Sequence, residues 1–310
     1  MTPLDSDRPA QDTAYDAIVI GAGPAGLTAA TYLGRFLRKA LVLDGGRSRA
    51  SWIPESHNTP GFPHGVGGEA LLDRLRDQAD RYGAERRAGR ARTLLRGADG
   101  FVLAIDQENA DAPVIARAPF VLLATGVVDR LPVLEGVEDA IRAARVRLCP
   151  ICDGYEASGQ RIAVLGDGEH GAREAAFLTT YSPAVTLLDL RPDAPMEGER
   201  EGDGAFERLP VSLADITLGP DGVMVGDRTF DCLYPALGFD SQQALAQQVD
   251  AARDADGRLV VSAHQQTSVD GLYAAGDVVR GLNQIAVATA EAAIAATDIH
   301  NRLRALARPG

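Results

Sequence analysis

Two stretches of this chain share one pattern of hydrophobic and polar positions. In the first, a short apolar run at 15–20 ends in a glycine-rich turn, and a helical run at 27–36 and an apolar run at 40–43 follow. Asp44 closes the second apolar run. The glycines of the turn are Gly21, Gly23 and Gly26. Short apolar runs on either side of a helical segment predict two parallel strands joined by a helix.

The pattern returns in the second half of the chain. A strand is expected at 161–165, a helix at 172–181 and a further strand at 185–188, which ends at Asp189. The turn between the first strand and the helix holds Gly166, Gly168 and Gly171. Gly166 and Asp189 stand as far apart as Gly21 and Asp44, so the chain is expected to carry two related folds.

A glycine turn between a strand and a helix, with an acid about 20 residues on, is the fingerprint of dinucleotide binding. The glycines let the backbone approach a pyrophosphate at the helix N-terminus, and the acid accepts hydrogen bonds from a ribose. A glycine turn without any ligand is the alternative. The flanking strand, helix and acid favour the dinucleotide fold, and hence an α/β class with two Rossmann-like domains.

Other segments add to this α/β pattern. A run at 71–82 is amphipathic with helical spacing, and strands are expected at 101–105 and 114–116. Gly219 to Gly222 predicts a hairpin turn, and 230–238 a strand. Four further features are candidate ligand contacts: Thr125 and Gly126 after the buried run 120–124, Asp277 after 271–276, Gln284 and Ile285 at the start of a helix to about 303, and Asn58 in the glycine- and proline-rich segment 45–67.

Length and charge limit the classes of function. The 310 residues allow about two domains, with a hydrophobic content of 45% and a formal charge of −12. That charge argues against nucleic acid or an anionic membrane as partner, and no apolar run approaches a membrane span. The polar, acidic start, residues 1–14, is expected to be a disordered tail and not a signal peptide, which favours a cytoplasmic location.

The chemistry is expected at Cys149-Pro150-Ile151-Cys152-Asp153, where two of only three cysteines stand. Sulfurs at this spacing open and close as a redox disulfide. Half of a zinc site would need a second Cys/His pair, and Cys232 stands alone, so no metal is expected. A static disulfide is the other alternative, which a reducing compartment disfavours. His57 is a candidate second acid–base group, although an exposed loop histidine is the commoner case.

Taken together, these residues resemble the low-molecular-weight thioredoxin reductases, FAD-dependent pyridine nucleotide-disulfide oxidoreductases, over 15–303. The resemblance implies a homodimer with a split FAD domain (15–127 and 240–310) and an inserted nucleotide domain with the cysteine motif (128–239). It implies that FAD is held by Gly21, Gly23, Gly26, Asp44, Asp277, Gln284 and Ile285. It also implies that Cys149 attacks the substrate disulfide, Cys152 exchanges electrons with the flavin, and Asp153 is the general acid. The substrate would be a thioredoxin-like protein or a small dithiol or disulfide.

The sequence departs from this family in two ways. Where the family carries a His-Arg-Arg triplet for the NADPH 2′-phosphate, this chain has Asp189-Leu190-Arg191, and only Arg191 fits. NADH is therefore expected over NADPH, or neither nucleotide is used. Tyr155-Glu156 resembles a sister group, the flavin-dependent dithiol oxidases, which use oxygen and have lost nicotinamide binding. A dithiol oxidase and a non-catalytic redox sensor thus remain as alternatives.

Overall fold

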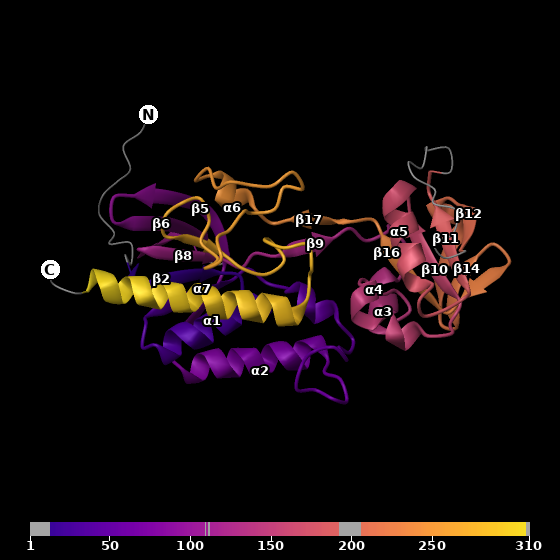
Figure 1. Ribbon diagram of the computed structural model, residues 1–310, viewed down its shortest axis with the longest axis horizontal. Coiled ribbons are helices and arrows are strands. Elements are labelled where there is room, and N and C mark those ends of the chain that lie inside the picture. Colours follow the sequence, from indigo (N-terminus) through magenta and orange to yellow (C-terminus); the bar gives the residue numbers. More distant parts are fainter. Residues whose placement is uncertain (1–12, 109, 111, 192–205, 308–310) are drawn as a thin grey trace. The chain divides into compact units, whose positions relative to one another are not determined.

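The computed structural model describes residues 13–108, 110, 112–191 and 206–307 (Figure 1). The chain divides into two compact units. Unit 1 comprises the described residues of Met1–Ala50, Ala70–Val127 and Ser241–Gly310. Unit 2 comprises the described residues of Ser51–Glu69 and Val128–Asp240. The chain passes between the units at four points, and two of these lie in β9 (Val127–Asp129) and β17 (Phe239–Ser241), which pair with each other.

Unit 1 is built on a five-stranded parallel sheet in the order β18-β8-β2-β3-β4. Its strands are β2 (Ala17–Ile20), β3 (Ala40–Asp44), β4 (Glu85–Ala88), β8 (Phe120–Leu123) and β18 (Leu272–Ala274). All residues of β2 and β8 are buried, because both faces of the sheet are covered. Helix α1 (Pro24–Arg35) packs against α7 (Ile285–Leu306), as Figure 1 shows.

A second sheet of unit 1 has the order β1-β7-β6-β5. Its strands are β1 (Thr13–Ala14), β5 (Arg90–Gly97), β6 (Gly100–Asp106) and β7 (Val114–Ala118). One core joins the two sheets, with Ile18 and Val121 of the parallel sheet beside Leu103 and Ile105 of β6. Helix α2 (Gly68–Arg81) buries Leu71, Leu72 and Ala79 from its amphipathic face.

Unit 2 repeats the parallel arrangement in the order β12-β11-β10-β16. Its strands are β10 (Ile162–Gly166), β11 (Val185–Asp189), β12 (Glu207–Pro210) and β16 (Cys232–Ala236), with α5 (Gly168–Leu178) between β10 and β11. Alternate residues of β16 enter two cores: Cys232, Tyr234 and Ala236 pack with α5, and Leu233 lies in the other. An antiparallel meander, β13 (Ile216–Gly219), β14 (Gly222–Val225) and β15 (Arg228–Phe230), adds Val223, Val225 and Phe230 to that second core.

The remaining helical segments are short: η1 (Arg49–Trp52), α3 (Val137–Arg142), α4 (Pro150–Asp153), η2 (Tyr155–Ala157), η3 (Leu213–Asp215) and α6 (Ala244–Gln247). No helix of the described residues is both long enough and apolar enough to cross a lipid bilayer.

Two expectations need correction. Thr13 and Ala14 are not part of a tail, because they pair in parallel with Ala116 and Arg117 of β7; residues 1–12 lie outside the described residues. The single strand expected at 230–238 is two strands separated at Asp231. β15 continues the antiparallel meander, whereas β16 joins the parallel sheet.

Candidate active site

The cysteine motif forms a disulfide at the start of a short helical turn in unit 2. Cys149 has an extended backbone and Pro150 begins α4, so the chain turns at once and the Cys152 N–H donates to the Cys149 carbonyl at 2.9 Å. This turn brings the two Cα atoms to 5.2 Å and the sulfurs to bonding distance, 2.06 Å. A thiol–disulfide pair at this spacing supports two-electron exchange.

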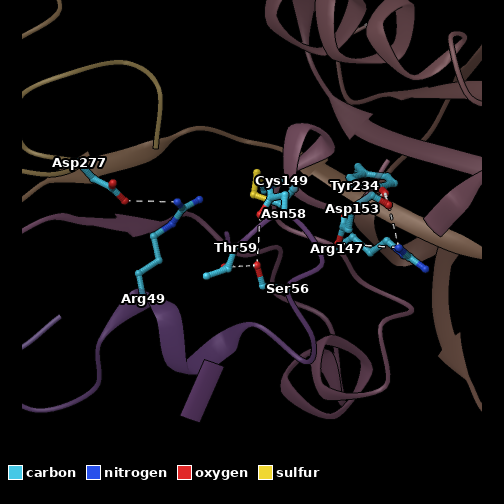
Figure 2. Close-up of a disulfide and its surroundings, with 10 residues drawn as sticks. Arg49, Ser56, Asn58, Thr59, Arg147, Cys149, Asp153, Tyr234 and Asp277 are labelled. Carbon is cyan, nitrogen blue, oxygen red and sulfur yellow. Dashed lines mark hydrogen bonds and ion pairs between the residues drawn. A yellow bond between two sulfur atoms is a disulfide. The ribbon is translucent and has the colours of Figure 1, made fainter. Parts of the chain in front are cut away.

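Asp153 follows the disulfide and is held by two side chains from elsewhere in unit 2 (Figure 2). The Tyr234 hydroxyl donates to Asp153 Oδ1 at 2.9 Å. Arg147 Nη1 donates to the Asp153 carbonyl at 3.0 Å and lies 3.8 Å from Oδ2. Burial raises the pKa of Asp153, Arg147 and Tyr234 oppose this rise, and the nearby Glu156 adds to it; together they place the pKa at about 6. The carboxyl group can therefore hold and release a proton near neutral pH.

Strand pairing explains why Arg147 and Tyr234 meet. Val146 forms a parallel bridge with Leu233 of β16, and Arg147 N–H donates to the Leu233 carbonyl at 2.9 Å. Neighbouring residues on a strand point to opposite faces, so Arg147 and Tyr234 lie on the face away from Val146 and Leu233. Nothing in the local sequence around Asp153 indicates this pairing.

The first glycine turn has the shape of a pyrophosphate site. Gly21 has φ 113°, and a Cβ there would stand 2.2 Å from the Ala124 carbonyl oxygen. A Cβ on Gly26 would stand 1.8 Å from the Gly21 carbonyl oxygen, so strand and helix touch at this point. At Gly23, by contrast, the nearest atom to a Cβ is Ser48 Oγ at 3.1 Å. Gly23 is also the N-cap of α1 and has no side-chain cap, so the space and the free amides fit the FAD pyrophosphate.

Further FAD candidates lie in unit 1. Asp44 ends β3, and its Oδ1 accepts from the Gly46 N–H at 3.0 Å. Asp277 pairs with Arg49 at 3.4 Å, a partner that sequence reasoning missed (Figure 2). Gln284 is the N-cap of α7 and Ile285 its first residue.

The other predicted contacts have structural partners. Thr125 Oγ1 donates to the Gln242 carbonyl at 2.5 Å, and the Gly126 carbonyl accepts from Gln242 N–H at 3.0 Å. These bonds join the chain ends that lead to and from unit 2. The Asn58 Oδ1 accepts from Ser56 Oγ at 3.2 Å, within the segment Ser51–Glu69 that groups with unit 2.

The second glycine turn keeps the dinucleotide backbone but carries acids. A Cβ on Gly166 would stand 2.9 Å from the Gly171 Cα, whereas no atom lies within 4 Å of the Cβ position of Gly168. Asp167 and Glu169 occupy the variable positions of the turn. Farther along α5, burial and Asp129 raise the pKa of Glu174 to about 7.

Asp189 lies at the end of β11 as expected, but its side chain is fully buried. Its Oδ1 accepts from the Arg191 N–H at 2.9 Å, and its Oδ2 binds the Arg208 guanidinium of β12. In this arrangement the carboxylate is not exposed to a ribose. Arg191 Nη2 binds Asp167 Oδ2 at 2.6 Å, so the one arginine that fits the 2′-phosphate pattern already has an anionic partner.

His57 and the third cysteine, Cys232, show no feature that points to catalysis. His57 Nε2 lies 3.2 Å from Glu55 Oε2, and both side chains are exposed. Cys232 is fully buried in β16, and burial raises the pKa of its thiol to about 12, so it stays protonated and unreactive. Among the described residues, no three His, Cys, Asp or Glu side chains are arranged to hold a metal ion.

Comparison with known proteins agrees with this geometry. Residues 15–209 and 214–292 match the family model described as pyridine nucleotide-disulphide oxidoreductase, and the chain belongs to this family. Within it, the chain is a thioredoxin reductase-like, FAD-dependent disulfide oxidoreductase. It is 31% identical to a thioredoxin reductase of Mycolicibacterium smegmatis, over 92% of this chain and 95% of that protein.

Two other relatives extend this likeness. A bifunctional thioredoxin reductase/thioredoxin of Mycobacterium leprae is 32% identical, with 95% of this chain and 67% of that protein covered. The structure of thioredoxin reductase from Giardia duodenalis superposes with a TM-score of 0.80 at 26% identity, with 94% of this chain and all of that chain covered (100%). Each of the two shares nearly the whole of this chain, so the likeness extends over both units.

Proposed function

We propose that this enzyme passes electrons from a nicotinamide nucleotide, through FAD and the Cys149–Cys152 disulfide, to the disulfide of a thioredoxin-like protein or a small molecule. One observation carries the proposal: the Cys149–Cys152 disulfide is followed directly by Asp153, a carboxyl group that Tyr234 and Arg147 hold in place and whose pKa burial raises to about 6. Bound FAD supplies the two-electron exchange between the nucleotide and the cysteine pair. Substrate reduction then needs only the residues of the motif.

In the proposed reaction, two electrons and two protons open the disulfide to two thiols. Cys149 attacks the substrate disulfide as a thiolate, forms a mixed disulfide and releases one substrate thiolate. Asp153 delivers a proton to a leaving thiolate and regains one through solvent from the proton that Cys149 released when it became a thiolate. Cys152 then attacks the Cys149 sulfur, which releases the second substrate thiol and restores the Cys149–Cys152 disulfide. Cys149 therefore has to meet the substrate, and Cys152 exchanges electrons with the flavin.

We further propose NADH as the preferred donor. A 2′-phosphate carries close to two negative charges and needs cations beside the ribose. Here Arg191 is bound to Asp167, and Arg208 is bound to the buried Asp189. NADH binding would need the glycines of the second turn. At Gly166 and Gly171 these glycines keep strand and helix in close contact.

A dithiol oxidase that delivers electrons to oxygen is the second candidate. The acids Asp167 and Glu169 in the second turn favour it, because they stand where a dinucleotide would place its negatively charged pyrophosphate. Tyr155-Glu156 after the cysteine motif points the same way. A redox sensor is a third possibility, which turnover separates: a sensor is reduced once and does not cycle.

Anaerobic titration of the oxidised holoprotein tests the proposal. NADH is added to one sample and NADPH to a second, and the flavin absorbance of each is followed. Bleaching by NADH, followed by reoxidation with a disulfide substrate over many turnovers, is the expected result. Absence of bleaching with both nucleotides would contradict the reductase proposal.

The family resemblance also supports a homodimer and a cytoplasmic location. Light scattering of the purified holoprotein should give about twice the chain mass of 32.7 kDa. A monomer mass at assay concentration would contradict the dimer.

A further inference from the structure

Tyr234 and Arg147 hold Asp153 from two sides and have no other assigned part in the chemistry. Tyr234 is fully buried, and the Arg147 side chain is 10% exposed. Each binds the Asp153 backbone carbonyl as well as facing one carboxyl oxygen: Tyr234 OH lies 3.2 Å from the carbonyl and Arg147 Nη1 3.0 Å. The Tyr234 bond to Oδ1 and the Arg147 charge beside Oδ2 orient the carboxyl group, and the contacts to the carbonyl fix the main chain at Asp153.

We propose that Tyr234 and Arg147 are positioning residues, which fix the Asp153 carboxyl group at the cysteine motif and stabilise its ionised form. The proposal rests on the proposed role of Asp153 as the acid of disulfide exchange. A hydroxyl that donates to a carboxylate and a guanidinium beside it both favour the charged form. After Asp153 has given its proton away, these two groups would stabilise the carboxylate that remains.

The balance of charges around Asp153 shows why both residues are needed. Burial and Glu156 favour the neutral acid, whereas Arg147 and Tyr234 favour the carboxylate. Cys232, the first residue of β16, and the preceding Asp231 also interact with this cluster: Asp153 and Asp231 raise the pKa of the Cys232 thiol, and Arg147 lowers it. An acid whose pKa rose far above neutrality would keep its proton and no longer assist the leaving thiolate. The pair therefore keeps Asp153 in its working range.

The pH dependence of a single turnover tests this inference. Holoprotein reduced with one equivalent of dithionite is mixed with 2-hydroxyethyl disulfide between pH 5 and 9, because its alkyl thiolate is basic enough to need a proton as it leaves. The reaction is quenched with acid at set times, and the released alkyl thiol is quantified by chromatography to give a profile of rate against pH. In the profile of rate against pH, the limb where the rate changes with the protonation of Asp153 is the readout. Tyr234→Phe should move the midpoint of this limb upward by about one pH unit. Arg147→Met should move it upward by about one unit or more, and Arg147→Lys, which keeps the charge, should restore most of the wild-type position.

Two controls separate this effect from general loss of structure. Glu156→Gln removes a group that raises the pKa of Asp153, so it should move the limb downward. Tyr273→Phe should leave the limb unmoved: Tyr273 is fully buried in unit 1 and donates to Asp298 at 2.5 Å, so it matches Tyr234 in burial and bonding. If Tyr234→Phe loses its flavin, the opposite shifts of Arg147→Met and Glu156→Gln decide alone.

Asp153→Asn identifies which statement has failed. If Asp153→Asn removes the limb but Tyr234→Phe and Arg147→Met leave it in place, Asp153 keeps its proposed role and the positioning inference is overturned. If the limb survives in Asp153→Asn, the acid is another group, and both the proposed role and the inference fall.

Discussion

Gly23 is the residue at which the FAD assignment can be tested most directly. A Cβ there would meet only Ser48 Oγ within 4 Å, the end of a short side chain, so we expect Gly23→Val to fold. The side chain would nevertheless fill the space that the pyrophosphate needs. We predict loss of bound FAD, measured as the ratio of flavin to protein absorbance. Gly97→Val is the matched control: it lies on β5, and its Cβ would meet only Gly100 O, at 3.7 Å. Full flavin content in Gly23→Val would refute the assignment of this turn.

The two cysteines should differ in their spectra. Cys149→Ser leaves Cys152 as the one thiol of the motif, and a thiolate against oxidised flavin gives a long-wavelength charge-transfer band. We predict this band in Cys149→Ser and its absence in Cys152→Ser, with disulfide turnover lost in both. The band is measured by absorbance during titration from pH 6 to 9. The reverse pattern would exchange the roles of the two sulfurs.

Asp153 should also lower stability at neutral pH. Its pKa is about 6 in the folded protein against an ordinary value of 3.8, so the folded state holds the proton more tightly and loses this advantage as the pH rises through 6. We predict that Asp153→Asn raises the free energy of unfolding at pH 7.5 by on the order of 2–3 kcal/mol. The gain should shrink toward pH 4. Urea unfolding at both pH values measures it.

Asp231→Asn provides a control of opposite sign for that measurement. Hydrogen bonds from the Arg161 side chain and main chain lower the pKa of Asp231, so its charge stabilises the folded state at neutral pH. Its replacement should therefore lower stability slightly at pH 7.5 and have no effect at low pH. A stability gain from both variants would show that loss of negative charge in general, and not burial of Asp153, is the cause.

The residues of the cysteine motif and the glycine turns could be predicted because their chemistry depends on local spacing. Arg147 and Tyr234 could not, because their meeting depends on a parallel bridge between Val146 and Leu233, far apart in the chain. Asp189 shows the same limit. Its position at a strand end was predictable, but its burial depends on Arg208, which β12 brings beside it.

At the scale of elements, buried strands were predictable and exposed strands were not. β2, β8 and β10 are continuous runs without a polar side chain, fully buried, and their pattern stands out in the sequence. β4 and β5 are rich in arginine, and Leu94 is the one buried residue of the two strands. Pairing with β3 and β6 supplies their hydrogen bonds, so their strand character comes from neighbours and not from a hydrophobic pattern.

The turn between β10 and α5 gives a prediction at the same scale. Asp167→Asn should release Arg191 from its 2.6 Å ion pair and leave a guanidinium near the expected 2′-phosphate. We predict that NADPH gains on NADH in the rate of anaerobic flavin reduction. Glu169→Gln removes the same charge from the same turn but leaves Arg191 paired, because Glu169 lies 3.5 Å from Arg173 instead.

The comparison of the two variants decides the cause of donor preference. An equal gain of NADPH in Asp167→Asn and Glu169→Gln would show that total charge, and not the Asp167–Arg191 pair, sets the preference. A strong preference of the wild-type protein for NADPH would contradict the argument from the start.

At the scale of the molecule, one architecture occurs twice in the chain. Both units place a glycine turn between the first strand of a parallel sheet and a helix, and both end the next strand at an acid, Asp44 or Asp189. The backbones of the two turns are alike, but the side chains differ: the first turn has Ala22, Pro24 and Ala25 between its glycines, and the second has Asp167, Glu169 and His170. The first turn presents no charge to a pyrophosphate, whereas the second presents two carboxylates, each with an arginine partner: Asp167 with Arg191 and Glu169 with Arg173.

The carboxylates of the second turn separate the two candidate functions, because a reductase has to bind a nucleotide there and a dithiol oxidase does not. The direction of electron flow through the whole enzyme is therefore the decisive prediction. Gly166 and Gly171 let strand and helix pack closely, and Gly168 leaves the space in front of the turn open. We therefore predict that NADH-dependent reduction of a disulfide under nitrogen is faster than peroxide formation from a dithiol in air. Disulfide reduction is followed by nucleotide absorbance and peroxide by a coupled peroxidase assay, with Cys149→Ser as the inactive control in both. If neither nucleotide reduces the flavin while dithiol and oxygen yield peroxide, the acids of the second turn have abolished nucleotide binding. The enzyme would then be a dithiol oxidase.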